Sequence, residues 1–438
     1  MPSQSIIRAA VLGMIVSTGA LAAFADTPLA PQARDGRWVS SWGAAQMVPG
    51  AQDALPALQW RDATLRQVVH VSLGARVVRV RVSNAFGSAP LTLDSASLAL
   101  AAGPGRADVD AGSIRPLRFD GRAVVTIPAG AEYASDPVEL PHAAGADLAV
   151  SLHFLAEPTG QSGHPGARAT SFVASGDRVL EAHWAEAEKV TRWFQLAAIE
   201  VLAAPGVHSV VAIGDSITDG YGATIDGNDR WTDALSARLR ASSMLDIGVV
   251  NAGIGGGRLL RDGLGPNLVS RFERDVLGRS GVTHAIVMIG VNDLGVQHRN
   301  NEDTPAARQY LLDQLKQAHR QLVERAHARG VCVIGATITP YAGSGYYQPN
   351  ADNERDRQSY NGWIRASALA RGIPHGLFDG VADFDAALRD PARPDQLLKA
   401  YDNDGLHPTL AGYKAMADAV PLALLQQCTR AAGVASRP

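Results

Sequence analysis

The spacing of apolar residues changes about halfway along the chain, and this change constrains the fold more than any other feature. In the first part, over about residues 38–201, short runs alternate apolar and polar residues, with glycine and proline between them. Such runs are typical of the antiparallel strands of a β-sandwich or jelly roll. In the second part, from about residue 207, apolar runs alternate with segments of helical periodicity. That alternation predicts a parallel sheet with helices on both faces.

The two patterns predict two domains, at residues 37–203 and 207–430, and a length of 438 residues favours that number. In the first domain we expect strands at 68–72, 77–82, 91–93, 123–127, 148–154 and 197–201. In the second domain we expect strands at 208–215, 245–252, 284–290, 331–338 and 375–379. The helices of the second domain are expected at 230–241, 266–278, 305–329, 352–371 and 409–427.

The first 25 residues have the pattern of a secretory signal peptide. Arg8 gives a short positive segment, residues 9–23 are small and apolar, and the sequence AFA before Asp26 fits a cleavage site. An uncleaved membrane anchor is the alternative, but the apolar stretch is short and interrupted by polar residues. We therefore expect a signal peptide at 1–25, a leader at 26–36, and a secreted or periplasmic protein. No other segment is apolar enough to predict a membrane span in the mature chain.

The overall composition describes a soluble globular protein, with 46% hydrophobic and 19% charged residues. A net charge of −3, without a basic patch, gives no indication of nucleic-acid binding. The two cysteines, Cys332 and Cys428, form neither a zinc-binding spacing nor a disulfide framework. An exported protein can hold one disulfide. The last predicted helix would run back toward the start of the fourth strand and bring Cys428 toward Cys332. The sequence leaves open whether the two cysteines form a disulfide.

The first strand of the second domain ends at a serine. The apolar run 210–213 leads into Gly214, Asp215 and Ser216, and a polar turn follows. In open parallel sheets, ligands bind at the carboxyl ends of the strands, which is where this serine would lie. Ser216 is therefore a candidate nucleophile. The alternative is that it only caps the next helix or forms the turn.

Two further strand ends offer hydrogen-bond donors. The second strand leads into the glycines of segment 253–257, where a backbone N–H has no side chain to block an approaching oxygen. A dinucleotide-binding loop does not fit, because Arg258 occupies the position of its last glycine. The third strand ends before Asn292, whose amide could point into the same crevice. Ordinary tight turns are the alternative for both segments.

Near the C-terminus, Asp404 and His407 stand three residues apart, with Gly405 and Pro408 in the same short loop. A carboxylate at this spacing can accept a hydrogen bond from one ring nitrogen while the other nitrogen faces a nucleophile. Among the 12 histidines, His407 is the one with an orienting acid beside it and a strand-end serine elsewhere in the chain. The sequence thus predicts a general base at His407.

Taken together, these four segments resemble the four conserved blocks of the GDSL/SGNH hydrolase superfamily. The blocks are Gly214-Asp215-Ser216-Ile217, the glycine run after Asn251, Gly290-Val291-Asn292-Asp293, and Asp404-x-x-His407. They follow the family's order and cover roughly residues 207–427. The resemblance implies a flavodoxin-like three-layer α/β/α domain with a five-stranded parallel sheet, here preceded by a β-sandwich or jelly-roll domain.

The resemblance also implies residue roles. Ser216 would be the nucleophile, His407 the general base, and Asp404 the acid that holds the imidazole. The oxyanion hole would consist of the Ser216 N–H, the Gly256 N–H and the Asn292 side chain, with Gly255 or Gly257 as alternatives to Gly256. Ile217 replaces the family's leucine with a residue of similar volume. Thr218 stands where the nucleophile elbow of ordinary α/β-hydrolases has a glycine, which argues against that fold.

Three other residues are candidates for the substrate pocket: Asp215, and Tyr341 and Tyr346 from a glycine-rich loop after the fourth strand. A structural role is the alternative for Asp215. We expect an exported serine esterase acting on small-molecule or polysaccharide esters with short acyl groups, without metal or cofactor. An acyltransferase with the same triad, or a non-catalytic carbohydrate-binding protein, is the alternative.

Overall fold

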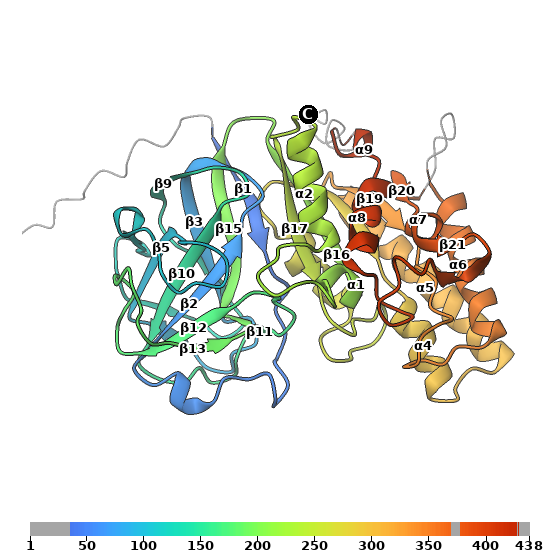
Figure 1. Ribbon diagram of the computed structural model, residues 1–438, viewed down its shortest axis with the longest axis horizontal. Helices are drawn as coiled ribbons and strands as arrows, with labels where there is room; N and C mark the ends of the chain where they lie inside the picture. Colours follow the sequence, from blue (N-terminus) through green and yellow to red (C-terminus); the bar gives the residue numbers. More distant parts are fainter. Residues whose placement is uncertain (1–35, 369–376, 427, 429–438) are drawn as a thin grey trace, which may run out of the picture.

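The computed structural model describes residues 36–368, 377–426 and 428. An N-terminal β-sandwich domain and a C-terminal α/β domain lie side by side, in blue to green and in yellow-green to red respectively (Figure 1). The predicted signal peptide and all but the last residue of the predicted leader lie outside the described residues. In the described part of the chain, no helix is long and apolar enough to cross a membrane.

Two antiparallel sheets form the N-terminal domain. The first consists of β1 (Arg37–Gly43), β15 (Leu196–Ala203), β3 (Ala75–Ser83), β8 (Glu132–Ala134) and β9 (Val138–His142). The second consists of β13 (Glu188–Val190), β12 (Ser171–Ser175), β2 (Ala63–His70), β10 (Asp147–Phe154), β5 (Ser95–Leu100) and β6 (Arg115–Pro116). Two short pairs lie beside them: β4 (Leu91–Leu93) with β7 (Val125–Ile127), and β11 (Gly163–His164) with β14 (Trp193–Phe194).

The core of the sandwich follows from the alternation in the sequence. On β3, Val78, Val80 and Val82 are fully buried, whereas Arg79 and Arg81 between them are partly exposed and pair with Glu200 of β15. These valines share one core with Leu65 of β2 and Val150 of β10, on the other sheet. The two-sheet sandwich is therefore confirmed, and jelly-roll connectivity stays a prediction.

The C-terminal domain is built on one parallel sheet of five strands, as predicted. Its order is β17 (Ile247–Gly253), β16 (His208–Gly214), β18 (Val282–Met288), β19 (Cys332–Ala336) and β20 (Gly380–Ala382). In this order β16, the first strand of this domain, lies between the second and the third. That is the flavodoxin-like arrangement, whose ligands bind where the strand order reverses.

Helices cover both faces of this sheet. One face carries α2 (Trp231–Ala241), α7 (Phe384–Leu388), α8 (Leu410–Ala419) and α9 (Ala423–Gln426). The other carries α3 (Leu268–Phe272), with a π-helical turn at Glu273–Leu277, and α4 (Val291–Arg299), α5 (Pro305–His327) and α6 (Ala351–Ala366). On β16, Val210 and Ala212 face the first set, and Val211 and Ile213 face the second. The strand is buried on both sides, which explains its continuous apolar run.

Several predicted boundaries differ from the structure. The helix predicted at 352–371 is α6, which ends at Ala366. The fifth strand was predicted at 375–379 but is β20 at Gly380–Ala382, which begins one residue after the predicted end. Residues 375 and 376 lie outside the described part. The last helix was predicted to run unbroken over 409–427, but α8 ends at Ala419 and α9 begins at Ala423. Pro421 lies between them and has no N–H to continue the helix.

The two domains pack along the edge strand β17. The Ser40 N–H in β1 donates to Ser280 O, and Ser72 Oγ accepts the Val249 N–H of β17. The buried Arg279 guanidinium donates to the carbonyls of Ala197 and Ala44. These contacts hold the sandwich along β17, the outer strand of the parallel sheet.

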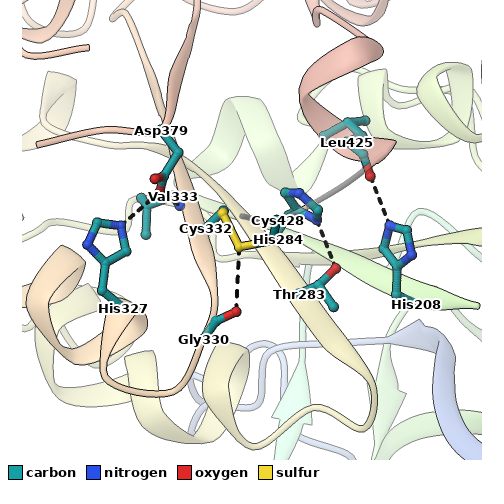
Figure 2. The surroundings of a disulfide bond; sticks show 10 residues. All are labelled: His208, Thr283, His284, His327, Gly330, Cys332, Val333, Asp379, Leu425 and Cys428. Carbon is teal, nitrogen blue, oxygen red and sulfur yellow. Dashed lines mark hydrogen bonds and ion pairs between the residues drawn. A yellow bond between two sulfur atoms is a disulfide. The ribbon is translucent and has the colours of Figure 1, made fainter. Parts of the chain in front are cut away.

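A disulfide joins Cys332, the first residue of β19, to Cys428, beyond α9 (Figure 2). Beside it, Asp379 accepts hydrogen bonds from His327 Nε2 and from the Val333 N–H. All five strands are parallel, so their starting ends lie together and their carboxyl ends lie together at the opposite end of the sheet. The start of β19 is therefore far from the carboxyl end of β16. The bridge that the sequence left open is therefore present, and it lies far from Ser216.

Candidate active site

The structure brings three distant residues into one hydrogen-bonded chain. Ser216 is the first residue of α1 (Ser216–Asp219), directly after β16, and His407 lies in the loop before α8. Ser216 Oγ is 2.8 Å from His407 Nε2, and His407 Nδ1 is 2.8 Å from Asp404 Oδ2. The hydroxyl, imidazole and carboxylate thus lie in the order that a serine hydrolase requires.

The Asp404 carboxylate both folds the loop and orients the ring. Its Oδ1 accepts the backbone N–H groups of Leu406 and His407, while Oδ2 accepts the ring N–H of His407. Gly405 between them has φ +79°, and a Cβ there would lie 2.1 Å from Gly343 O. Glycine is therefore needed both for the backbone conformation and for the close approach of the neighbouring loop.

The protonation states suit nucleophilic chemistry. Burial lowers the pKa of His407 below its ordinary value of 6.5, although the hydrogen bond to Asp404 opposes this effect. Partial burial acts to raise the pKa of Asp404, but the hydrogen bonds from the His407 backbone and ring outweigh it and keep the pKa low. A neutral imidazole next to an ionised carboxylate can accept the Ser216 proton at neutral pH.

Candidate oxyanion donors line the same cavity as Ser216. Gly256 has φ +66° and lies in the cavity wall with Gly255 and Asn292. The N–H of Gly257 donates to Ile254 O within a turn, so that amide is already engaged. Of the three glycines considered from the sequence, the geometry thus disfavours Gly257.

The side chain of Asn292 is held from both ends. Its Nδ2 donates to Gly257 O at 2.7 Å, and its Oδ1 accepts the Tyr347 hydroxyl at 2.6 Å. An amide has two N–H groups, so the second hydrogen on Nδ2 is left for the cavity. Burial raises the pKa of Tyr347, which keeps its hydroxyl protonated as a donor. Tyr347 lies in the same glycine-rich loop as Tyr341 and Tyr346, and sequence reasoning did not predict its contact with Asn292.

Two of the three predicted pocket residues lie elsewhere. Asp215 is fully buried and caps α1, with Oδ1 accepting the Ile217 N–H at 3.0 Å. Burial raises the pKa of Asp215 to about 7, and the nearby Asp293 carboxylate adds to the shift. Tyr341 is 1% exposed and packs in the core of the α/β domain. The structural alternative for Asp215 thus fits its position, and Tyr341 does not reach the cavity.

Tyr346 does line the cavity, as predicted, and is 63% exposed. The cavity has a volume of about 500 Å³, and apolar side chains such as Leu264, Val296 and Leu406 form much of its wall. Ser216, Asp404 and His407 lie in the same wall. An ester of moderate size can therefore reach the serine.

The sandwich domain contacts α1, the helix that begins with Ser216, a feature that sequence reasoning missed. His164 Nε2 is 2.9 Å from Asp219 Oδ1, at the end of α1, and both side chains are buried. The other ring nitrogen of His164 lies 2.8 Å from Ala45 O. No local motif marks this pair, because its members come from two domains.

One group among the described residues has the composition of a metal site: His284, Cys332 and Cys428. The two cysteines are joined in the disulfide, and His284 lies beside them with its Nδ1 2.8 Å from Thr283 Oγ1 (Figure 2). Thiolates are the form that binds metals, so a disulfide does not fit that role. The group also lies at the edge of the sheet away from Ser216.

Residues 212–415 match the model of the GDSL-like Lipase/Acylhydrolase family. The match begins within β16 and ends within α8, so it includes Ser216, Asn292, Asp404 and His407. No curated protein matches the chain.

Several solved structures match about half of the chain. A putative acylhydrolase from Bacteroides fragilis NCTC 9343 is 23% identical, with a TM-score of 0.36, over 50% of this chain and 86% of that one. A GDSL-like lipase from Bacteroides thetaiotaomicron VPI-5482 is 21% identical, with a TM-score of 0.37, over 51% and 91%. A variant of an acetyl xylan esterase from Geobacillus stearothermophilus is 22% identical, with a TM-score of 0.36, over 50% and 94%.

Proposed function

The chain carries a GDSL-like lipase/acylhydrolase domain and belongs to the GDSL/SGNH superfamily as a carboxylic ester hydrolase, and from this premise we propose that Ser216, His407 and Asp404 are its catalytic triad. The observation that carries the proposal is the unbroken chain of two 2.8 Å hydrogen bonds from Ser216 through His407 to Asp404. The lowered pKa of His407 supports its role as a base at neutral pH.

In the proposed mechanism, Ser216 Oγ attacks the ester carbonyl while His407 Nε2 takes the hydroxyl proton. Asp404 holds the ring in the required tautomer and stabilises the imidazolium that forms. The N–H groups of Ser216 and Gly256 and the Asn292 amide would stabilise the oxyanion of the tetrahedral intermediate. Removal of a single donor of this kind typically lowers kcat by about 10²–10³-fold.

The imidazolium then gives its proton to the leaving alcohol, and the acyl-enzyme forms. Water enters the same cavity, His407 takes a proton from it, and the resulting hydroxide attacks the acyl-enzyme. Collapse of the second tetrahedral intermediate releases the carboxylic acid and restores the Ser216 hydroxyl.

We further propose that the substrate is a short-chain acyl or acetyl ester of a carbohydrate or other polar alcohol, and that the protein is exported. Export is supported by the signal-like pattern of residues 1–25, and a disulfide between Cys332 and Cys428 is compatible with an oxidising compartment. Mass spectrometry of the N-terminus of protein recovered outside the cytoplasm tests this part. Recovery only from the cytoplasm, with residues 1–25 intact, would contradict it.

The decisive experiment is hydrolysis of p-nitrophenyl esters of increasing chain length, together with acetylated polysaccharides, by the wild type and Ser216→Ala. The variant should lose about 10⁴-fold or more in kcat. Ser242→Ala, on an exposed residue after α2, is the matched control and should keep wild-type activity. Near-normal hydrolysis by Ser216→Ala would overturn the proposal. Adding an acceptor sugar to the same reactions separates hydrolysis from acyl transfer.

A further inference from the structure

A second cavity adjoins the active site, at the junction of the two domains. It has a volume of about 470 Å³, and sandwich residues from two loops, including Val48, Pro49 and Arg168, form one wall. Gly255, Gly263 and Leu264 of the α/β domain line both this cavity and the one that contains Ser216. The two cavities therefore adjoin at these residues, and a substrate bound at Ser216 lies next to the second cavity.

Most charged side chains of this second cavity already have partners. Asp53 pairs with Arg192 at 3.2 Å, and Asp219 pairs with His164 at 2.9 Å. Arg168 differs, because no acidic residue in the described part of the chain forms an ion pair with it. A guanidinium is always charged and carries five N–H donors, so Arg168 has capacity left for an anion.

The position of Arg168 is fixed by its surroundings. Its backbone has φ +48°, a conformation that residues other than glycine rarely adopt, and its carbonyl accepts the Asp226 N–H. Its Nε donates to Gly220 O at 3.3 Å. These contacts leave the two terminal nitrogens of the guanidinium as donors, in the fork that suits a carboxylate or phosphate.

Arg168 also lies close to the catalytic histidine. Its guanidinium carbon is 5.4 Å from the centre of the Tyr221 ring, and that ring lies 4.1 Å from the centre of the His407 ring. The guanidinium is therefore separated from the imidazole by a single side chain. A group bound to Arg168 would therefore lie close to Tyr221, which also lines the cavity that contains Ser216.

We propose that this second cavity binds the alcohol part of the substrate, and that Arg168 binds an anionic group on it, a carboxylate or a phosphate. The inference rests on the proposed function and deepens it, since it makes the preferred substrate an acyl ester of an acidic sugar or a sugar phosphate. The exposed side chains of Val48 and Leu264 offer an apolar surface to the sugar ring. Arg258 and Arg299 line the active-site cavity without an ion pair to any described residue, so they favour the same charge.

The experiment compares three esters with the same acetyl group: an acetylated methyl glucoside, the corresponding methyl glucuronoside, and the corresponding methyl glucoside phosphate. At low salt, the wild type should prefer one or both charged esters over the neutral ester by about tenfold in kcat/KM. Higher salt should reduce the preference. The ratio between the two charged esters identifies which anion the site takes.

Arg168→Gln should remove most of the preference for charged esters, with the remainder due to Arg258 and Arg299, and Arg168→Lys should keep a larger part of it. Arg320→Gln is the matched control, because Arg320 also lies over an aromatic ring, Trp363, but on the exposed side of α5. It should keep the wild-type ratio. Circular dichroism checks that each variant is folded.

Two results would overturn the inference. One is a wild type without preference for either charged ester. The other is an equal loss of kcat/KM for neutral and charged esters in Arg168→Gln, which would mean that Arg168 only positions Tyr221 against His407. If the wild type hydrolyses none of the three esters nor p-nitrophenyl acetate, the proposed function itself fails.

A second measurement needs no variant. Free glucuronate or glucose 6-phosphate should inhibit the wild-type hydrolysis of p-nitrophenyl acetate competitively, at concentrations at which glucose does not. Equal inhibition by the neutral and charged compounds would contradict a site for an anion.

Discussion

His164 of the sandwich domain and Asp219 of α1, the helix that begins with Ser216, form a buried pair, with His164 Nε2 2.9 Å from Asp219 Oδ1. The sandwich loop approaches so closely that a Cβ at Gly166 would lie 2.0 Å from Asp219 Oδ2. Because α1 contains only four residues, it gains little stability from its own hydrogen bonds. The sandwich therefore helps to hold the segment that presents Ser216.

Replacing His164 with alanine should destabilise the protein and reduce its activity. The change leaves the Asp219 carboxylate buried without its partner, which typically costs about 3–5 kcal/mol. Thermal unfolding and kcat, measured well below the unfolding temperature, check both effects. His183→Ala is the control, since His183 lies 3.7 Å from Asp108 with its side chain 80% exposed. Similar unfolding temperatures for the two variants would contradict a role for the buried pair.

Tyr347→Phe should lower kcat and leave KM nearly unchanged. The hydroxyl of Tyr347 donates to Asn292 Oδ1, so its loss frees the amide to rotate away from the oxyanion position. We expect a loss of about tenfold, smaller than the 10²–10³-fold typical for removing a donor itself. Tyr310→Phe, on an exposed residue of α5, should behave like the wild type. A rise in KM at constant kcat would instead assign Tyr347 to substrate binding.

The buried carboxyl of Asp215 should make stability depend on pH. Burial raises its pKa from 3.8 to about 7 in the folded state. A raised pKa means that the protonated form favours folding, so its contribution is complete below pH 3.8 and is lost as the pH rises to about 7. Asp215→Asn stays neutral throughout and should gain stability relative to the wild type across this window, by at most about 1.4 kcal/mol per pH unit.

Thermal unfolding of both proteins at several pH values measures that difference. Asp246→Asn, on an exposed residue before β17, is the control and should run parallel to the wild type. A constant difference between Asp215→Asn and the wild type over the whole window would show that Asp215 is ionised in the folded protein.

Removing the disulfide should affect stability and leave catalysis intact. Cys332 and Cys428 are 96 residues apart, and a cross-link over a loop of that size typically contributes about 2–5 kcal/mol. The variant Cys332→Ser/Cys428→Ser should therefore unfold at a lower temperature with an unchanged kcat, because the bridge lies at the opposite edge of the sheet from Ser216. Wild type treated with a reductant should show the same shift. A folded variant with a reduced kcat would contradict this separation.

The sequence predicted the elements whose signals are local. The apolar run of β16 and the spacing of Asp404 and His407 each depend on a few neighbouring residues, so the fold class is confirmed and the loop geometry agrees with expectation. The catalytic roles stay predictions. The end of the last long helix could also have been predicted from the neighbouring residues, because Pro421 follows it and interrupts the helix.

Contacts between segments that are distant in the sequence could not be predicted from local patterns. His164 meets Asp219 only because the sandwich packs against the sheet, and neither residue belongs to a recognisable motif. The glycine-rich loop after the fourth strand predicted that its tyrosines lie near the active-site cavity. The sequence does not show which of these side chains line the cavity and which are buried in the core. Tyr347 contacts Asn292 and Tyr341 packs in the core, a difference set by the path of the loop in three dimensions.

The packing of the sandwich against β17 has a further consequence for solubility. β17 is the last strand on its side of the parallel sheet, and its Val249 N–H is bonded to the side chain of Ser72 in the sandwich domain. An uncovered edge of this kind is a template for strand addition by a second molecule. By covering it, the N-terminal domain protects its neighbour from aggregation, and the α/β domain expressed alone would expose that edge.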